Sequence, residues 1–183
     1  LTSIDQTTDT CTNNYATMNP LLVTSSTPSF SEGNLAITTS ALSTWQSAFS
    51  TIAVTQGKWY CEIKFESGQD VMLGIVKESS ATNSFTAGSN YPGINSGGYG
   101  YYEPDGNLYN NGSASSYGNS YTTGDIIGIA VDLDNNYLYF SKNGTFQNSG
   151  DPTSSTGAIT VTAPSSLDNG NYFTDGNIYP GGS

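Results

Sequence analysis

The sequence predicts an all-β fold, an antiparallel β-sandwich, and three observations support this. Apolar and polar residues alternate with a period of two in residues 57–66 and again in residues 125–144. Gly, Ser, Thr and Asn are abundant between these segments, which is typical of short strands joined by polar loops. No long helical periodicity is found along the 183 residues. The length suits one domain of two packed sheets around a single core.

Residues 125–144 predict a β-hairpin. Ile127 and Ile129 begin an alternation that breaks at residues 134–136 and resumes beyond them. Asn tolerates the left-handed backbone that tight turns require, so we expect residues 134–136 to reverse the chain. The Asn-Gly pair at residues 143–144 predicts a second turn at the end of the hairpin.

Residues 57–66 predict a half-buried strand, because one of its two faces is apolar and the other polar. The apolar face consists of Trp59, Cys61, Ile63 and Phe65, and the polar face of Tyr60, Glu62, Lys64 and Glu66. We expect the apolar face to be buried, with Cys61 as a core residue. The spacing leaves open whether Cys61 pairs with Cys11, the other cysteine of the chain.

Four segments occur in order along the chain: GKWYCEIKF at 57–65, VMLGIV at 71–76, GYGYYEPDGNLYNNG at 98–112 and GDIIGIAVDLDNNYLYFSKNG at 124–144. Together they resemble the SPRY domain family, and the resemblance covers residues 36–146. It implies a concanavalin-like jelly roll of the SPRY type. It also implies a binding scaffold that presents loops from a rigid sandwich.

A shorter segment at residues 9–20, DTCTNNYATMNP, resembles the lead-in found on SPRY-containing tail or virion proteins of aquatic bacteriophages. This second resemblance implies an extracellular location on a virion. The partners that it implies are other virion subunits or identical chains, together with a host-surface glycan or protein.

We expect residues 1–33, which are rich in Thr, Ser, Asn and Pro, to form an extended N-terminal arm. Residues 34–183 are expected to form the sandwich, incomplete at its C-terminal end because only residues 171–173 suggest a further strand. An uncovered sheet edge needs a partner. We therefore expect an oligomer in which residues 1–33 and 168–183 make the intersubunit contacts.

The chain begins with Leu, so we also expect it to be processed or part of a longer protein.

The composition excludes several classes of function. Fifteen acidic residues face four Lys and no Arg, for a formal net charge of −11, so binding to nucleic acid or to anionic membrane surfaces is disfavoured. No apolar run of 18 residues is present, and no membrane insertion is expected. The chain has no His, which removes Ser-His and Cys-His catalysis and the commonest zinc ligand. We expect no cofactor and no metal.

Asp132 and Asp134 form the best carboxylate pair for an enzyme of the glycosidase type. Residues i and i+2 of a strand point the same way about 6.5–7 Å apart, which such chemistry permits. Asp beside a hairpin turn is, however, favoured for hydrogen bonds to the local backbone. We favour this second interpretation and predict no catalytic residues. The same segment fails as an EF-hand, because Tyr137 replaces the required Gly and Asn143 the required acidic residue.

Tyrosines in and around residues 91–121 are the richest candidates for binding. We expect Tyr99 and Tyr101, which share one face, to lie in the core. The candidate binding residues, expected to be exposed, are Tyr91, Tyr102, Tyr109 and Tyr117. Tyr combines a rigid apolar ring with a polar tip, which suits sugar stacking and protein interfaces. The alternative is that alternating Tyr residues merely cover the sheet.

The leading functional hypothesis is a non-enzymatic structural or recognition module of a virion, acting as a tail fibre, spike or capsid-decorating subunit. The first alternative is a carbohydrate-binding or glycan-hydrolysing domain, which would use the tyrosines or the pair Asp132 and Asp134. The second alternative is a subunit of a bacterial surface filament. Fold alone does not choose among these functions.

Overall fold

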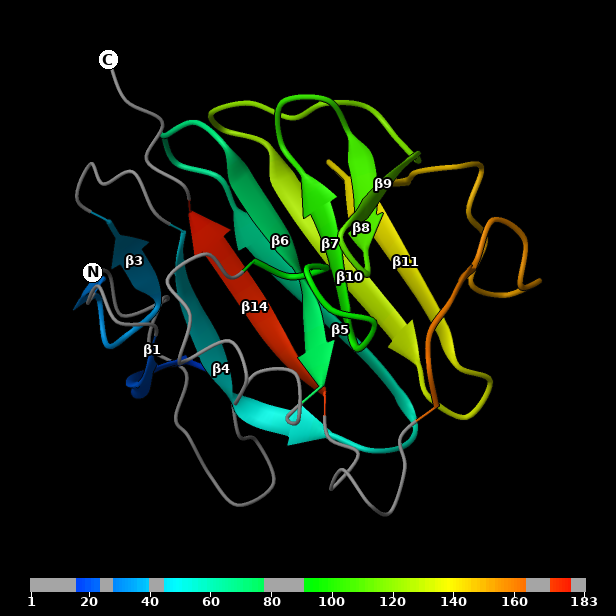
Figure 1. The fold of residues 1–183 in the computed structure, drawn as a ribbon, viewed down its shortest axis with the longest axis horizontal. Coiled ribbons are helices and arrows are strands. Elements are labelled where there is room, and N and C mark those ends of the chain that lie inside the picture. Colours follow the sequence, from blue (N-terminus) through cyan, green and yellow to red (C-terminus); the bar gives the residue numbers. More distant parts are fainter. Residues whose placement is uncertain (1–15, 24–27, 40–44, 78–90, 164–171, 179–183) are drawn as a thin grey trace.

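The structure is a computed structural model that describes residues 16–23, 28–39, 45–77 and 91–163, together with the backbone strand at 172–178. Two antiparallel sheets pack face to face, and the described residues contain no helix. Figure 1 shows the two layers, with β10 and β11 passing behind β7 and β8. The predicted all-β antiparallel sandwich is confirmed.

The larger sheet has seven strands, and every neighbouring pair in it is antiparallel. In spatial order they are β1 (Met18–Val23), β4 (Gln46–Val54), β14 (Tyr172–Ile178), β6 (Val71–Lys77), β7 (Gly98–Tyr102), β8 (Asn107–Asn110) and β9 (Ser113–Ser116). The last strand of the chain therefore lies in the middle of the sheet (Figure 1).

The smaller sheet has five strands. Its main path is β12 (Thr145–Phe146), β11 (Tyr137–Lys142), β10 (Ile126–Asp132) and β5 (Lys58–Lys64), and β13 (Ile159–Thr160) also pairs with β11. A separate small hairpin joins β2 (Ser29–Ser31) to β3 (Ala36–Thr38) beside the larger sheet. Among the described strands, β5 forms one edge of the smaller sheet.

The hairpin predicted at residues 125–144 is confirmed as β10 and β11, paired in continuous register from Ile127 opposite Lys142 to Asp132 opposite Tyr137. Asn136 adopts the expected left-handed backbone, with φ 60°. Asn143 (φ 50°) and Gly144 (φ 79°) form the second turn, as the Asn-Gly pair predicts.

The core lies between the two sheets and follows the period of two. Its buried residues are Phe65, Val71, Leu73, Ile75, Tyr99, Tyr101, Tyr117, Tyr121, Ile127, Ile129, Val131, Leu133, Leu138, Phe140, Ile159 and Val161. Ile63 and Cys61 are partly buried and pack against this core. The predicted core positions of Tyr99, Tyr101, Ile63 and Ile129 are confirmed. The hydroxyl of buried Tyr121 lies within hydrogen-bonding distance of two strand carbonyls, 3.1 Å and 3.0 Å away, so its burial leaves no unsatisfied donor.

The prediction that Trp59 is buried is wrong, because half of its surface is exposed. Trp59 lies near the start of an edge strand and folds back over the turn that precedes it. Its indole nitrogen donates to the carbonyl oxygen of Gln56 at 2.7 Å. The ring therefore covers Gly57 and not the core.

The expected absence of a closing strand is also wrong. β14 pairs with β4 along one edge and with β6 along the other, so it completes the larger sheet. Residues 172–178 therefore have no free edge to offer a neighbouring subunit. The remaining residues of the segment expected to make contacts, 168–171 and 179–183, lie outside the described residues.

The N-terminal segment contains more structure than a simple arm. Residues 18–23 form β1 at the edge of the larger sheet, and β2 pairs with β3 across the expected boundary at residue 33. Residues 1–15 lie outside the described residues. The boundary at residue 33 and the oligomeric state stay predictions.

We predict that removing β14 abolishes folding. A chain ending at residue 171 leaves β4 and β6 without their common neighbour, which divides the larger sheet into two parts. Circular dichroism during heating should show no cooperative transition. A chain ending at residue 178 is the matched control and should unfold as the full chain does. A cooperative transition in the shorter chain would contradict the central role of β14.

Candidate functional site

Four aromatic side chains gather at the larger sheet and form the aromatic cluster: Trp45, Tyr91, Tyr102 and Tyr109. Ring centroids are 5.0 Å apart for Trp45 and Tyr91, and 5.4 Å apart for Tyr102 and Tyr109. The other two contacts, Trp45 with Tyr102 and Tyr91 with Tyr109, measure 6.2 Å and 5.9 Å. All four rings meet at tilted or edge-to-face angles, which the ring quadrupole favours. Each ring is half-buried.

Strand alternation places Tyr102 and Tyr109 on the face away from the core. Tyr101 points into the core, so its neighbour Tyr102 points outward. Tyr109 of β8 lies directly opposite Gly100 of β7, and paired residues share a face. Because Gly100 has no side chain, the space above β7 is open to a covering segment.

Residues 91–97 fill that space and position Tyr91. A Cβ atom at Gly100 would clash with the carbonyl oxygen of Pro92 and with the sulfur of Met72. Gly93, at φ 97°, approaches the backbone of Tyr109 equally closely. Two backbone hydrogen bonds tie the segment to the turn after β8, from Gly112 N to Gly93 O and from Asn111 N to Asn95 O, at 2.9 Å and 3.3 Å. Close backbone packing therefore brings Tyr91 beside Tyr109.

Acidic groups border the aromatic cluster. The hydroxyl of Tyr102 donates to Oδ1 of Asp70. Burial, followed by this hydrogen bond, raises the pKa of Tyr102 above its ordinary value. Burial and the nearby Asp105 raise the pKa of Tyr109 in the same direction. The phenols therefore stay neutral at physiological pH and present apolar rings beside carboxylates.

Three of the four candidate tyrosines thus meet in one cluster, but the prediction that Tyr117 is exposed is wrong. Tyr117 is 8% exposed and packs edge-on against Tyr101 and Phe140 in the core. Its hydroxyl accepts a hydrogen bond from the backbone nitrogen of Phe140 at 3.0 Å. Burial raises its pKa to about 12. The side chain joins the two sheets and is not available to a ligand.

Sequence reasoning missed Trp45 as a member of the site. It directly precedes β4 and lies 46 residues before Tyr91 in the sequence. β4 is separated from β7 in the sheet by β14 and β6, so the contact between Trp45 and Tyr102 depends on the strand order. The sequence carries no local signal for this contact.

Asp132 serves the hairpin turn, as predicted, whereas Asp134 bonds to the distant backbone just before β5. Oδ1 of Asp132 accepts from the backbone nitrogens of Asp134 and Asn135, both at 3.1 Å. Its Oδ2 forms an ion pair with Lys58 at 2.9 Å. Oδ1 of Asp134 accepts from the backbone nitrogen of Gly57 at 2.9 Å. Both carboxylates are therefore committed to holding the chain at this end of the smaller sheet.

Within the described ranges, no group of three or more Cys, Asp or Glu side chains converges where a metal ion could be held. The described part of the chain also contains no helix long and apolar enough to cross a membrane.

Comparison with known proteins identifies the fold and the family. The sequence matches the SPRY domain over residues 58–158, which is more than half of the chain. The chain belongs to the SPRY domain family. SPRY domains are typically protein–protein interaction modules. The structure is similar to that of the SPRY domain of human HERC1, with a TM-score of 0.60 over 90% of this chain and 91% of that one. Sequence identity is 16%, so this similarity concerns the fold.

The related sequences belong to larger animal proteins. Ran-binding protein 9 of Homo sapiens is 37% identical over 90 residues, which cover 48% of this chain and 12% of that protein. The Ran-binding proteins 9/10 homolog of Drosophila melanogaster is 34% identical over 90 residues. The ATP-dependent RNA helicase DDX1 of Xenopus laevis is 34% identical over 100 residues and is likewise matched over 12% of its length. The residues that match this chain thus make up a small part of each relative.

We predict that Gly100→Ala disrupts the aromatic cluster. The added methyl group would displace residues 91–97 from β7, and overpacking of this kind costs about 1–3 kcal/mol. Thermal unfolding should show the loss of stability, and the NMR shifts of the Tyr91 ring should change. Gly33→Asn is the control, because φ there is 68° and the surrounding space is open. Unchanged Tyr91 shifts in Gly100→Ala would refute this account of the site.

We predict a pH-dependent loss of stability in Asp132→Asn. The side-chain amide of Asn135 and the ammonium of Lys58 lower the pKa of Asp132 below 3.8. The ionised carboxylate therefore stabilises the fold above pH 3.8, and this contribution is lost as the pH falls through the lowered pKa. At pH 7 the variant should lose about 1 kcal/mol. Thermal unfolding from pH 7 to pH 2 should show the difference shrinking towards zero.

The matched control for this measurement is Glu66→Gln. Glu66 forms an ion pair with Lys64 at 2.7 Å, but both side chains are more than half exposed. Solvent screening should keep its effect below about 0.5 kcal/mol. An equal loss of stability in the two variants, or a constant loss across the pH range, would contradict the role assigned to Asp132.

Proposed function

We propose that this SPRY domain is a non-enzymatic recognition module that binds a protein partner through the aromatic cluster. The observation that carries the proposal is the convergence of Trp45, Tyr91, Tyr102 and Tyr109 from four separate parts of the chain. Half-buried Tyr and Trp rings of this kind supply a large contact area at a low cost in conformational entropy. Residues that dominate binding energy are enriched in both types.

The surroundings of the cluster favour a partner segment that combines apolar and basic side chains. Asp70 and Asp105 lie beside the rings, and the whole chain carries a net charge of −11. An Arg or Lys side chain over the face of a Tyr or Trp ring gains a cation–π attraction, and a neighbouring carboxylate adds to it. A partner with a negatively charged surface would be repelled by this chain.

The virion role is the more specific form of this proposal. In it, the cluster recognises a host-surface protein or another virion subunit, and the support is the lead-in segment at residues 9–20. The relatives found are animal proteins and give this role no support.

A carbohydrate-binding domain is the second candidate, because exposed parts of Tyr and Trp rings also stack on sugars. A glycan hydrolase would need a free carboxylate pair. Asp132 is bonded to the turn backbone and to Lys58, and Asp134 to the backbone nitrogen of Gly57, so this pair does not support hydrolysis. Simple glycan binding would use the same rings as protein binding. The two functions are separated by the identity of the ligand.

We predict that Tyr109→Ala weakens protein binding at least tenfold, because loss of a central aromatic residue costs about 1.4 kcal/mol or more. Peptides are first selected from a display library for binding to the intact chain. Their affinities for the intact chain and for Tyr109→Ala should then be measured by fluorescence anisotropy. Tyr137→Ala is the control, since Tyr137 is also half-buried but lies outside the cluster. Equal affinity for all three proteins would refute the proposed surface. Glycan-array binding that is lost in Tyr109→Ala would instead favour the carbohydrate function.

A further inference from the structure

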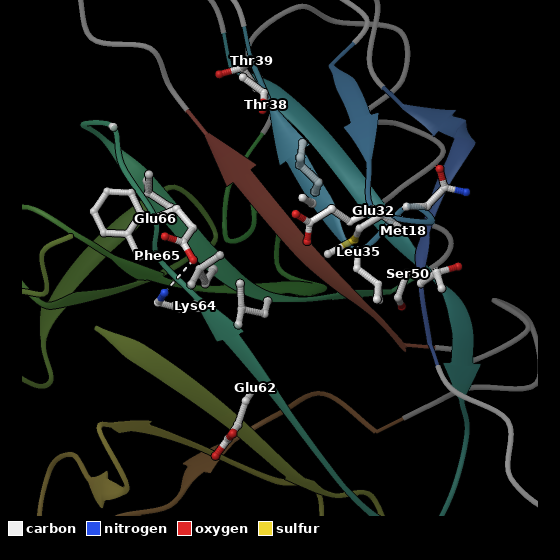
Figure 2. Close-up of a pocket in the computed structure, with 18 of the residues that line it drawn as sticks. Met18, Glu32, Leu35, Thr38, Thr39, Ser50, Glu62, Lys64, Phe65 and Glu66 are labelled. Carbon is white, nitrogen blue, oxygen red and sulfur yellow. Dashed lines mark ion pairs between the residues drawn. The ribbon is translucent and has the colours of Figure 1, made fainter. Parts of the chain in front are cut away.

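The smaller sheet has fewer strands than the larger sheet that it covers, and a groove lies beside its edge strand β5. On this side its last described strand is β5, whereas the larger sheet continues through β4 to β1. The groove has a volume of about 790 Å³ and lies between β5, the β2–β3 hairpin and the larger sheet, which contributes Met18, Ser50, Val71 and Leu73. Figure 2 shows Lys64, Phe65 and Glu66 on one side and Glu32 and Leu35 on the other. This volume is in the range of ligand sites in proteins.

The backbone of β5 has one row of hydrogen-bonding groups directed away from its only described neighbour. Leu133 N donates to Gly57 O, and Phe65 N donates to Asp125 O, both at 2.9 Å. In an antiparallel pair, hydrogen-bonded positions alternate, so the odd-numbered residues of β5 bond to β10. The N–H and C=O groups of Tyr60, Glu62 and Lys64 therefore point to the opposite side. No described strand pairs with them there.

The side chains along this edge suit a strand with alternating character. The groove side of β5 carries Cys61 and Ile63, which are partly buried, and burial raises the pKa of the Cys61 thiol to about 11. Across the groove, Leu35 is 67% exposed, so its side chain is available for contact with an apolar side chain of a bound segment. An added strand would direct every second side chain at these apolar groups.

The charges along the groove point to a basic partner. The described residues that line it include Glu32, Glu62 and Glu66 but a single cation, Lys64. Lys64 is already paired with Glu66 at 2.7 Å. The remaining carboxylates, Glu32 and Glu62, and the net charge of −11 would attract a peptide that carries Lys or Arg.

We propose that the free edge of β5 binds an extended peptide with alternating apolar and basic residues, as an additional strand of the smaller sheet. The backbone of the peptide bonds to Tyr60, Glu62 and Lys64, its apolar side chains enter the groove, and its basic side chains lie beside Glu62. Addition of a strand to an exposed sheet edge is an established mode of peptide recognition. The site is separate from the aromatic cluster and does not depend on the function proposed for it.

The probe is a peptide of about eight residues, a usual strand length, that alternates valine and lysine. Fluorescence anisotropy with the full chain should show saturable binding. Two peptides should bind at least tenfold more weakly: one with glutamate in place of lysine, and one with N-methyl groups on every second amide. No binding of the lysine peptide, or equal binding of the N-methylated one, would overturn the proposal.

Two variants at one position separate the backbone contribution from the charge. Glu62→Pro removes an N–H that β10 does not use, and Pro is tolerated at such positions of edge strands. Binding should weaken at least tenfold. Glu62→Gln keeps the N–H and removes only the charge, so a smaller loss of about threefold is expected. A loss in Tyr109→Ala as large as that in Glu62→Pro would place the peptide on the aromatic cluster and overturn the proposal.

Hydrogen exchange provides a measurement that does not depend on the folding of a variant. In the full chain with bound peptide, the amides of Tyr60, Glu62 and Lys64 should exchange at least tenfold more slowly. Protection near Tyr109 in place of β5 would overturn the proposal. So would a doubled mass of the free chain in solution with these amides already protected, since the edge would then be covered by a second copy.

Discussion

The pairing of β14 with both β4 and β6 is the constraint on which the rest of the structure depends. The last described strand of the chain lies between two parts of the larger sheet, β1 with β4 and β6 with β7, β8 and β9, and pairs with both. Trp45 reaches Tyr91 and Tyr102 because β14 holds β4 in the same sheet as β6 and β7. The groove beside β5 is lined by Ser50 of β4 and by Val71 and Leu73 of β6, so it also depends on the strand that joins β4 to β6. Both proposed sites are therefore products of one long-range strand pairing.

The second principle of the structure is that one strand can supply both the core and the surface. β7 directs Tyr99 and Tyr101 inward and Tyr102 outward, while Gly100 leaves room for the segment that carries Tyr91. Tyrosine side chains at adjacent positions of β7 thus lie on opposite faces and have different roles. Inside, tyrosine rings pack between the sheets and their hydroxyls bond to the backbone: that of Tyr121 to carbonyl oxygens and that of Tyr117 to the nitrogen of Phe140. Outside, the rings are half-exposed and lie beside carboxylates, which suits recognition.

The acidic residues also divide into two groups with different roles. Asp125 and Asp132 each accept local hydrogen bonds and pair with a lysine, which lowers the pKa of both carboxyls. These carboxylates stabilise the ends of the hairpin and are not free to act on a ligand. Glu32 and Glu62 border the groove, and Asp70 and Asp105 border the aromatic cluster. These four carboxylates are among the described acidic residues that border the two proposed sites.

The sequence by itself determined the sandwich, the β10–β11 hairpin and the core positions of Tyr99 and Tyr101, because alternation and turn chemistry are local properties. It also led to three members of the aromatic cluster. The tertiary structure decided the rest. Tyr117 follows an exposed, serine-rich strand, and only the packing of the second sheet shows that it is buried. Trp59 has the alternation of a core residue but lies at a sheet edge. The residues of β14, YFTDGNI, show no clear apolar alternation, so their central place came from pairing with two distant strands. Strand order and edge position depend on contacts between residues far apart in the chain, and a local sequence pattern cannot predict such contacts.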